Sequence, residues 1–166
     1  QNFPGNRHAS PLVCNDSIVA LGEKLFVLDP DNLRQPRVSV PGIAGSATPA
    51  IEGKLACVSA HTKIAACNIE TGTVLWETPH EEALLYFRGR PKQSGGVGCG
   101  NFSAPLVAAN GVVVCDTGGN VRCLKKENGE EMWRLTLGAP VLSAPSISGR
   151  TLFVCDYEGT VYAFSW

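Results

Sequence analysis

Side chains that could bind a ligand are concentrated in one stretch of the sequence, ETPHEEALLYFRGRPKQSGGVGCGNF. Three basic residues follow its tyrosine at alternate positions, and basic groups beside an aromatic ring can hold an anionic or carbohydrate ligand. We therefore expect ligand contacts from Tyr86, Arg88, Arg90, Lys92, Cys99 and Phe102. The alternative is that this stretch only covers a neighbouring part of the fold.

The same stretch offers little for catalysis or metal binding. Cys99 and His80 are the only pair that could serve as nucleophile and base, and nothing in the sequence brings them together. His8 and His61 have no zinc-ligand spacing to either residue. The glycines of 95–100 resemble a phosphate loop, but no helix is expected after them. We predict no catalytic residue and no metal site.

Length and charge exclude several classes of function. The chain has 166 residues and a formal net charge of -1, with both signs interspersed. It therefore lacks the basic stripe of a nucleic-acid-binding protein and any apolar run long enough to span a membrane. Its seven cysteines leave the redox compartment undecided, and a start at Gln1 rather than Met suggests a processed or excised product.

An internal repeat organises the rest of the sequence. Four stretches share a Pro-led entry: ASPLVCNDSIVALGEKLFVLD, ATPAIEGKLACVSAHTKIAAC, SAPLVAANGVVVCDTGGNVRCL and SAPSISGRTLFVCDYEGTVYAF. Two of them continue at nearly the same distance, 27 and 28 residues after the proline, to the tryptophans of TGTVLW and NGEEMW, Trp76 and Trp133. Such a recurrence indicates one structural unit repeated along the chain.

Each unit reads as short strands separated by tight turns. Proline suits the start of a strand because it donates no ladder hydrogen bond, and Asp or Gly suits the turns. Four antiparallel strands in about forty residues are typical of a β-propeller blade. We therefore predict an all-β propeller segment over 1–166 whose last blade lacks its outer strand, with blades at 9–46, 47–102, 103–142 and 143–166.

The second unit is longer than the others. About seventeen extra residues lie in the connection 77–102, between Trp76 and the next inner strand. In a propeller this connection lies on the face around the central channel, where ligands usually bind, and long loops are often functional. The candidate contact residues fall within it.

These features resemble the quinoprotein-like (PQQ-like) β-propeller repeat family. The resemblance rests on the Pro-led strand, the second-strand Val-Cys-Asp run and the final Gly-x-x-x-Trp, and it covers roughly 9–166. It implies that Trp76 and Trp133, with Gly72 and Gly129, dock blades against one another. Because such propellers have about seven or eight blades, it also implies that this chain is similar to a C-terminal half.

The resemblance does not imply a cofactor. Quinone-dependent members hold their cofactor against a disulfide between adjacent cysteines, and this chain has no Cys-Cys dipeptide. Their calcium-binding set of Glu, Asn and Asp has no match here. PQQ and calcium would be expected only if missing blades supplied the site.

We therefore expect a non-catalytic scaffold that binds a protein or carbohydrate ligand and is completed by the remaining blades of a parent polypeptide or by a second copy. The alternative is a segment of an enzyme, either a quinone-dependent dehydrogenase or a carbohydrate-active or hydrolytic enzyme. The resemblance implies a bacterial-type protein in the periplasm or outside the cell, although the sequence leaves a cytoplasmic location open.

Overall fold

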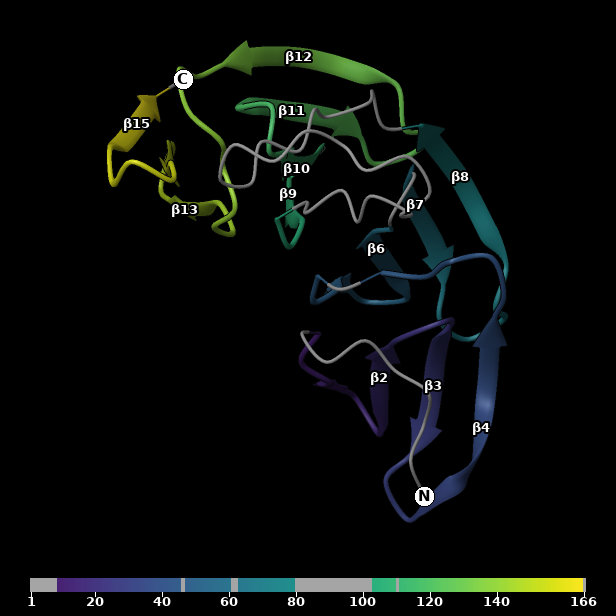
Figure 1. Cartoon of the computed structure of the whole chain (residues 1–166). Helices are drawn as coiled ribbons and strands as arrows, with labels where there is room; N and C mark the ends of the chain where they lie inside the picture. The colour runs from purple at the N-terminus through teal and green to yellow at the C-terminus, as the bar shows by residue number, and fades with distance from the viewer. Residues whose placement is uncertain (1–8, 46, 61–62, 80–102, 110, 166) are drawn as a thin grey trace, which may run out of the picture.

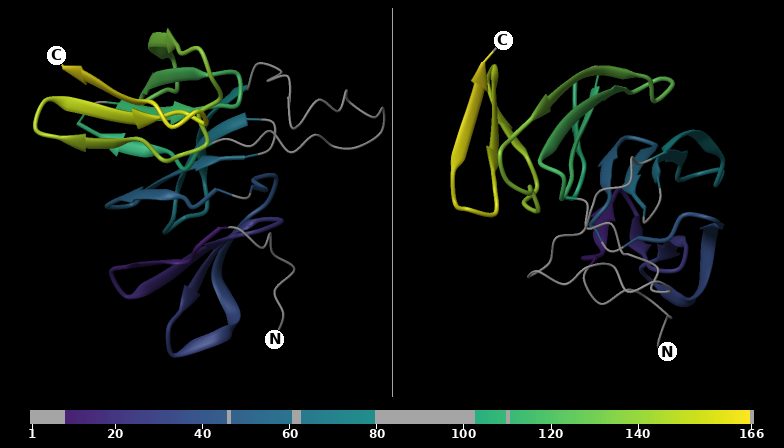
Figure 2. Two further views of the ribbon diagram at one scale, coloured as in Figure 1. Left: turned by 60° about the vertical axis from the view of Figure 1, so that its left-hand side comes forward. Right: turned by 45° about the horizontal axis from the view of Figure 1, so that its top comes forward.

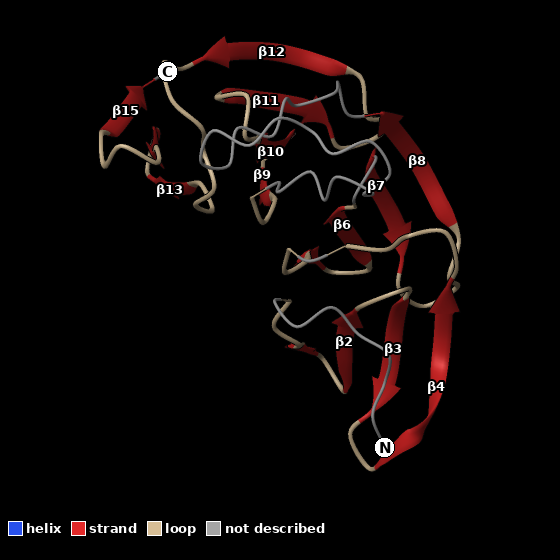
Figure 3. Cartoon of the chain, in the orientation of Figure 1, coloured by secondary structure: helices blue, strands red, loops and turns tan. Residues whose placement is uncertain are grey.

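The computed structural model describes residues 9–45, 47–60, 63–79, 103–109 and 111–165. These residues form fifteen β-strands, and no helix occurs among them (Figure 3). No helix able to cross a bilayer is found in this part of the chain.

The strands make four antiparallel sheets, each in simple chain order. The first sheet contains β1 (Leu12–Cys14), β2 (Ser17–Leu21), β3 (Leu25–Asp29) and β4 (Asn32–Val40). The second contains β5 (Ala50–Glu52), β6 (Leu55–Ser59), β7 (Lys63–Asn68) and β8 (Val74–Pro79). The third contains β9 (Leu106–Ala108), β10 (Gly111–Cys115), β11 (Asn120–Lys125) and β12 (Glu131–Thr136). The fourth contains β13 (Ser146–Ser148), β14 (Thr151–Cys155) and β15 (Val161–Ser165).

The sheets follow one another along an arc (Figure 1). The first strand of each sheet lies on the concave side of the arc, and β4, β8 and β12 lie on its convex side. Figure 2 shows the same succession from two further directions, with the fourth sheet at one end. The prediction of an all-β propeller fold with four blades, the last of them three-stranded, is confirmed.

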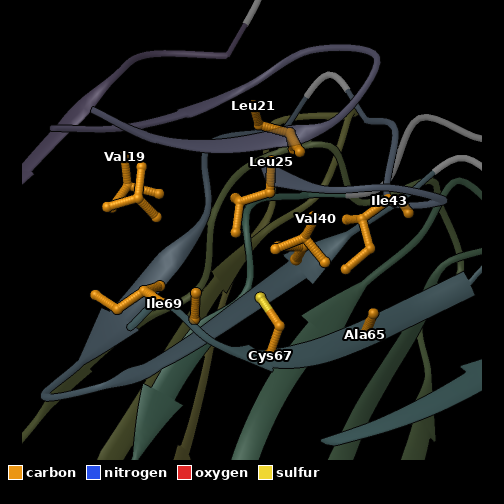
Figure 4. Packing of buried hydrophobic residues seen from close by; sticks show 12 residues of the cluster. Val19, Leu21, Leu25, Val40, Ile43, Ala65, Cys67 and Ile69 are labelled. Carbon is orange, nitrogen blue, oxygen red and sulfur yellow. The ribbon is translucent and has the colours of Figure 1, made fainter. Parts of the chain in front are cut away.

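Neighbouring sheets pack face to face through three separate apolar clusters. The first and second sheets share a cluster that includes Val19, Leu25, Ala65 and Cys67 (Figure 4). The second and third sheets share Trp76 and its neighbours, and the third and fourth share a cluster around Val121. Within the described residues the apolar core is therefore divided into three clusters, one at each junction.

Strand alternation gives every sheet two faces. We call the side that points toward the next sheet in chain order the forward face, and the opposite side the rear face. In the third sheet, Val113 and Val121 belong to the forward face, whereas Val112 and Leu124 belong to the rear face. Because side chains alternate with period two, the strand register fixes which residues meet each neighbour.

Candidate functional site

The predicted ligand contacts Tyr86, Arg88, Arg90, Lys92, Cys99 and Phe102 lie outside the described residues, as do His8, His61 and His80. The structure describes the residues on either side of the segment 80–102, namely Pro79 and Ser103. Strand β8 ends at Pro79, and the chain is described again from Ser103, which is buried. Ser103 is fixed on both sides: its N–H donates to Cys115 O at 3.1 Å, and its Oγ accepts from Cys115 N at 3.0 Å.

The rim beside Ser103 is built from backbone hydrogen bonds. We call it the connector rim: it comprises Ser103, the turn 116–119 and the connection 137–145. Within it, Leu137 N donates to Gly119 O at 2.8 Å, and Val141 N donates to Asp116 O at 3.0 Å. The connection is thereby tied to the third sheet at Leu137 and Val141, and the turn 116–119 that holds it directly follows Cys115, the partner of Ser103.

Two aspartates shape the turns of this rim and of the next sheet. Asp116 Oδ1 accepts from Gly118 N at 2.8 Å and from Asn120 N at 3.0 Å. Asp156 repeats the pattern in the fourth sheet. Burial alone would raise the pKa of Asp156, but hydrogen bonds from Thr160 N, Tyr162 Oη and Glu158 N outweigh it and lower that pKa. Both carboxylates are therefore engaged in closing turns.

The third sheet carries a charged cluster that no motif in the sequence indicates. Arg122 is only 6% exposed, and its Nε donates to Glu131 Oε2 at 2.6 Å. Arg134 donates to both oxygens of the same carboxylate, at 3.0 and 2.9 Å. The hydrogen bond from Arg134, together with that from Arg122, lowers the pKa of Glu131 to about 2 although burial opposes the shift. Glu131 thus stays ionised between two guanidinium groups.

The buried cysteines are poor nucleophiles, and the described cysteines show no metal-binding arrangement. The six described cysteines are free thiols. Burial raises the pKa of Cys57 and of Cys115 to about 12, so both remain protonated at neutral pH. Across the described ranges, no three His, Cys, Asp or Glu side chains converge in a way that could hold a metal ion.

A groove of about 340 Å³ lies between the first and second sheets. Its lining includes Cys14, Arg37 and Glu70. Arg37 is already committed, because its Nη2 contacts Asp29 Oδ2 at 2.6 Å and its Nη1 donates to Asp16 O at 3.1 Å. Among the described residues that line the groove, Arg37 is the only cation, and its ion pair with Asp29 leaves no free cation for a ligand there.

Trp76 joins the second sheet to the third. Its indole Nε1 donates to Lys126 O at 2.8 Å, and the buried ring rests on Gly129. A Cβ at Gly129 would lie 2.5 Å from Trp76 Cε3, so only glycine leaves room for the ring. Thr78 Oγ1 adds a hydrogen bond to Gly129 O at 2.7 Å.

The position that Trp76 occupies in the second sheet is filled by other residues in the first and third sheets. Register places Trp76 opposite Ala66, Trp133 opposite Cys123 and Val38 opposite Val27. Val38 therefore takes this position in the first sheet, where a bulge shifts the register. Val38 packs on Gly72 as Trp76 packs on Gly129. Trp133 lies half-buried among the apolar residues at the junction between the third and fourth sheets.

Comparison with solved structures shows the fold. BamB from Moraxella catarrhalis superposes with a TM-score of 0.69 at 18% identity, covering 91% of this chain and 43% of that one. The computationally designed Ika4 protein gives a TM-score of 0.72 at 14% identity, covering 99% of this chain and 95% of that one. The designed Ika8 protein gives 0.51 at 15% identity, covering 94% and 57%. This chain therefore spans less than half the length of the BamB structure.

Sequence comparison supplies the family. No curated protein matches the chain. The family model described as outer membrane protein assembly factor BamB matches residues 61–166, which include Trp76, Trp133 and the whole third and fourth sheets. With more than half of its length matched and its sheets arranged as PQQ-like blades, the chain belongs to this BamB-like family of β-propeller proteins.

Proposed function

We propose that this chain is part of a non-catalytic propeller scaffold that binds a protein or carbohydrate ligand at the connector rim. The observation that carries the proposal is the fixed base of the 80–102 segment. Ser103 is held by two hydrogen bonds to Cys115, and the adjoining connection is bonded to the turn 116–119. A rigid base presents a long loop without the entropic cost of ordering the whole surface on binding.

The chemistry of the described residues supports binding rather than catalysis. The thiols with raised pKa values are buried, and the carboxylates of Asp116 and Asp156 close turns. Glu131 is held as a salt-bridged carboxylate. Burial accounts for the state of these thiols and hydrogen bonds account for the placement of these carboxylates, so none of them needs a catalytic role to explain it.

The family supports a protein ligand outside the cytoplasm. Its description names an outer membrane protein assembly factor. We extend this to the present chain as a proposal. Because this chain spans 43% of the BamB structure, further blades are expected to complete the scaffold.

Paired binding assays test the proposal. The immobilised chain is exposed to a bacterial envelope extract, with bound proteins identified by mass spectrometry, and in parallel to a glycan array. The double variant Tyr86→Ala with Arg88→Ala should lose at least about tenfold in binding, equivalent to ~1.4 kcal/mol. Arg34→Ala, an exposed arginine on β4, is the matched control and should bind normally.

The outcomes separate three possibilities. Loss of captured protein in the double variant supports a protein platform, and loss of glycan binding supports a carbohydrate platform. Binding that is unchanged in the double variant would mean that 80–102 only covers the propeller. Absence of any specific binding would overturn the platform itself.

A further inference from the structure

The groove of about 340 Å³ between the first and second sheets has a filled counterpart at the next junction. Between the second and third sheets, the Trp76 indole is buried and donates to Lys126 O at 2.8 Å. The Lys126 ammonium group forms an ion pair with Glu52, which lies at the end of β5. An indole and an ion pair therefore close that junction at this end of its strands.

Two of the groups that close that junction have smaller counterparts at the groove. Val38 holds the register position of Trp76 in the first sheet. Cys14 ends β1 as Glu52 ends β5, each at the turn of an equivalent hairpin. Val38 and Cys14 both line the groove, so the hollow lies where the indole and the carboxylate lie at the next junction.

Ile69 takes the place of Lys126 and supplies an equivalent backbone acceptor. Each residue directly follows the third strand of its sheet and lies three positions before the glycine of the turn. Ile69 belongs to the apolar cluster between the first two sheets (Figure 4) and also lines the groove. Within the described residues no hydrogen bond reaches Ile69 O, whereas Lys126 O accepts the Trp76 N–H. The groove thus has a free carbonyl acceptor of the kind that a buried indole needs.

The charges at the groove favour a cation next to its occupant. Asp16 and Glu70 are exposed and line the groove. Glu70 is paired with Lys54, but no ion pair involves the Asp16 carboxylate in the part of the chain that the structure describes. A basic residue beside the inserted group would therefore meet the free carboxylate of Asp16.

We propose that this groove binds the tryptophan side chain of a peptide segment in a partner protein, with lysine or arginine next to that tryptophan. The indole packs on Val38 and Ile69 and donates to Ile69 O, as Trp76 donates at the next junction. The groove volume lies near the lower end of the range of about 300–1,000 Å³ for ligand pockets, which suits one large side chain. Tryptophan is also a frequent anchor in the pockets of protein interfaces.

The groove is distinct from the connector rim. It is lined by the β1–β2 and β7–β8 turns, whereas the connector rim contains the β10–β11 turn and the connection from β12 to β13. Because the strands of each sheet are antiparallel and follow chain order, these two sets of turns lie at opposite strand ends. The two sites can therefore be occupied independently, and the groove does not depend on the function proposed above.

Peptide titration tests the proposal. The probe is a short peptide with one tryptophan between two lysines, and its counterpart carries alanine in place of the tryptophan. In NMR titrations of the ¹⁵N-labelled chain, the tryptophan peptide should shift the amide signals of Cys14, Val38 and Ile69. It should bind at least about tenfold more tightly than the alanine peptide. Equal binding of the two peptides, or no shift of these signals at millimolar peptide, would overturn the proposal.

Two variants address the groove itself. Val38→Trp places an indole in the groove from within the chain, as at the next junction, and should abolish peptide binding. Asp16→Lys reverses the free charge and should weaken binding about threefold. Its matched control is Glu127→Lys, which makes the same change at an exposed position of the β11–β12 turn and should bind normally. Circular dichroism of the three variants checks that the fold is kept.

The remaining outcomes are equally decisive. A folded Val38→Trp chain that still binds the peptide contradicts the proposal, as does equal weakening by Asp16→Lys and Glu127→Lys. If N-acetyltryptophanamide binds as tightly as the peptide, the groove takes a small aromatic molecule and the peptide partner is wrong.

The connector-rim variant separates this proposal from the proposed function. Tyr86→Ala with Arg88→Ala should bind the tryptophan peptide normally, and loss of peptide binding in this variant would place the peptide at the connector rim instead. A chain that captures neither envelope protein nor glycan at the connector rim but binds the peptide in the groove would overturn the proposed function and support the groove.

Discussion

The junction between the second and third sheets and the forward face of the fourth sheet are built from the same repeat, but among the described residues only the first is covered by a neighbouring sheet. At the junction, Trp76 is buried on Gly129 and hydrogen-bonded to Lys126 O. On the fourth sheet, Val161 and Phe153 hold the corresponding inner positions and remain exposed. The comparison shows that equivalent register positions are buried at a junction between two described sheets and exposed on the fourth sheet.

Removing the indole should give the largest loss of stability. Trp76→Ala leaves a cavity between two sheets and an unpaired Lys126 carbonyl, so we expect a loss of about 3–5 kcal/mol in the free energy of unfolding. Trp133→Ala, at the less covered equivalent position, should cost less. Urea unfolding of both variants measures the difference, and equal losses would contradict the contrast between the junctions.

Filling the space beneath the Trp76 indole should give the second largest loss of stability. Gly129→Ala combines a φ of +74° with a Cβ 2.5 Å from Trp76 Cε3, so we expect a loss of about 2–4 kcal/mol. Gly149→Ala is the matched control, because its φ is +59° but its Cβ would meet open space. It should cost only about 1 kcal/mol from the backbone conformation. Thermal unfolding separates the two, and similar shifts would show that contact with Trp76 is unimportant.

Truncating the paired valines should have a smaller effect and tests the open face directly. Val121→Ala removes buried methyl groups and should cost about 2 kcal/mol, whereas Val161→Ala should cost under about 0.5 kcal/mol. Urea unfolding of both variants measures the difference. Equal costs would mean that Val161 is covered within one chain.

The charged cluster of Arg122, Glu131 and Arg134 on the third sheet gives the smallest expected effect on stability, and this effect depends on pH. Because the folded-state pKa of Glu131 is about 2 and its ordinary value is 4.5, its contribution is present above pH 4.5 and lost as the pH falls toward 2. After allowance for solvent screening we expect about 1 kcal/mol. The free energy of unfolding, measured at several pH values across this window, should change less with pH in Glu131→Gln than in the wild type. In the fourth sheet Tyr162 holds the register position of Arg122, so that sheet lacks this device.

Much of the fold could be predicted because strand pairing and turns are encoded locally. The repeated prolines, Asp-containing turns and glycines predicted four sheets, and Trp76 and Trp133 do lie opposite equivalent residues in β7 and β11. The Arg122, Glu131 and Arg134 cluster could not be predicted in this way. It depends on a bulge between Cys123 and Leu124 that shifts the pairing of β11 with β12. The predicted binding residues of 80–102 remain a prediction.

The sequence by itself determined the repeat, the alternation of each strand and hence which residues share a face, because side chains in a strand alternate with period two whatever surrounds them. Only the tertiary structure decided which faces are covered. Exposure depends on the neighbouring sheet rather than on the strand itself, so Val121 and Val161 occupy equivalent places in one pattern yet differ completely in burial.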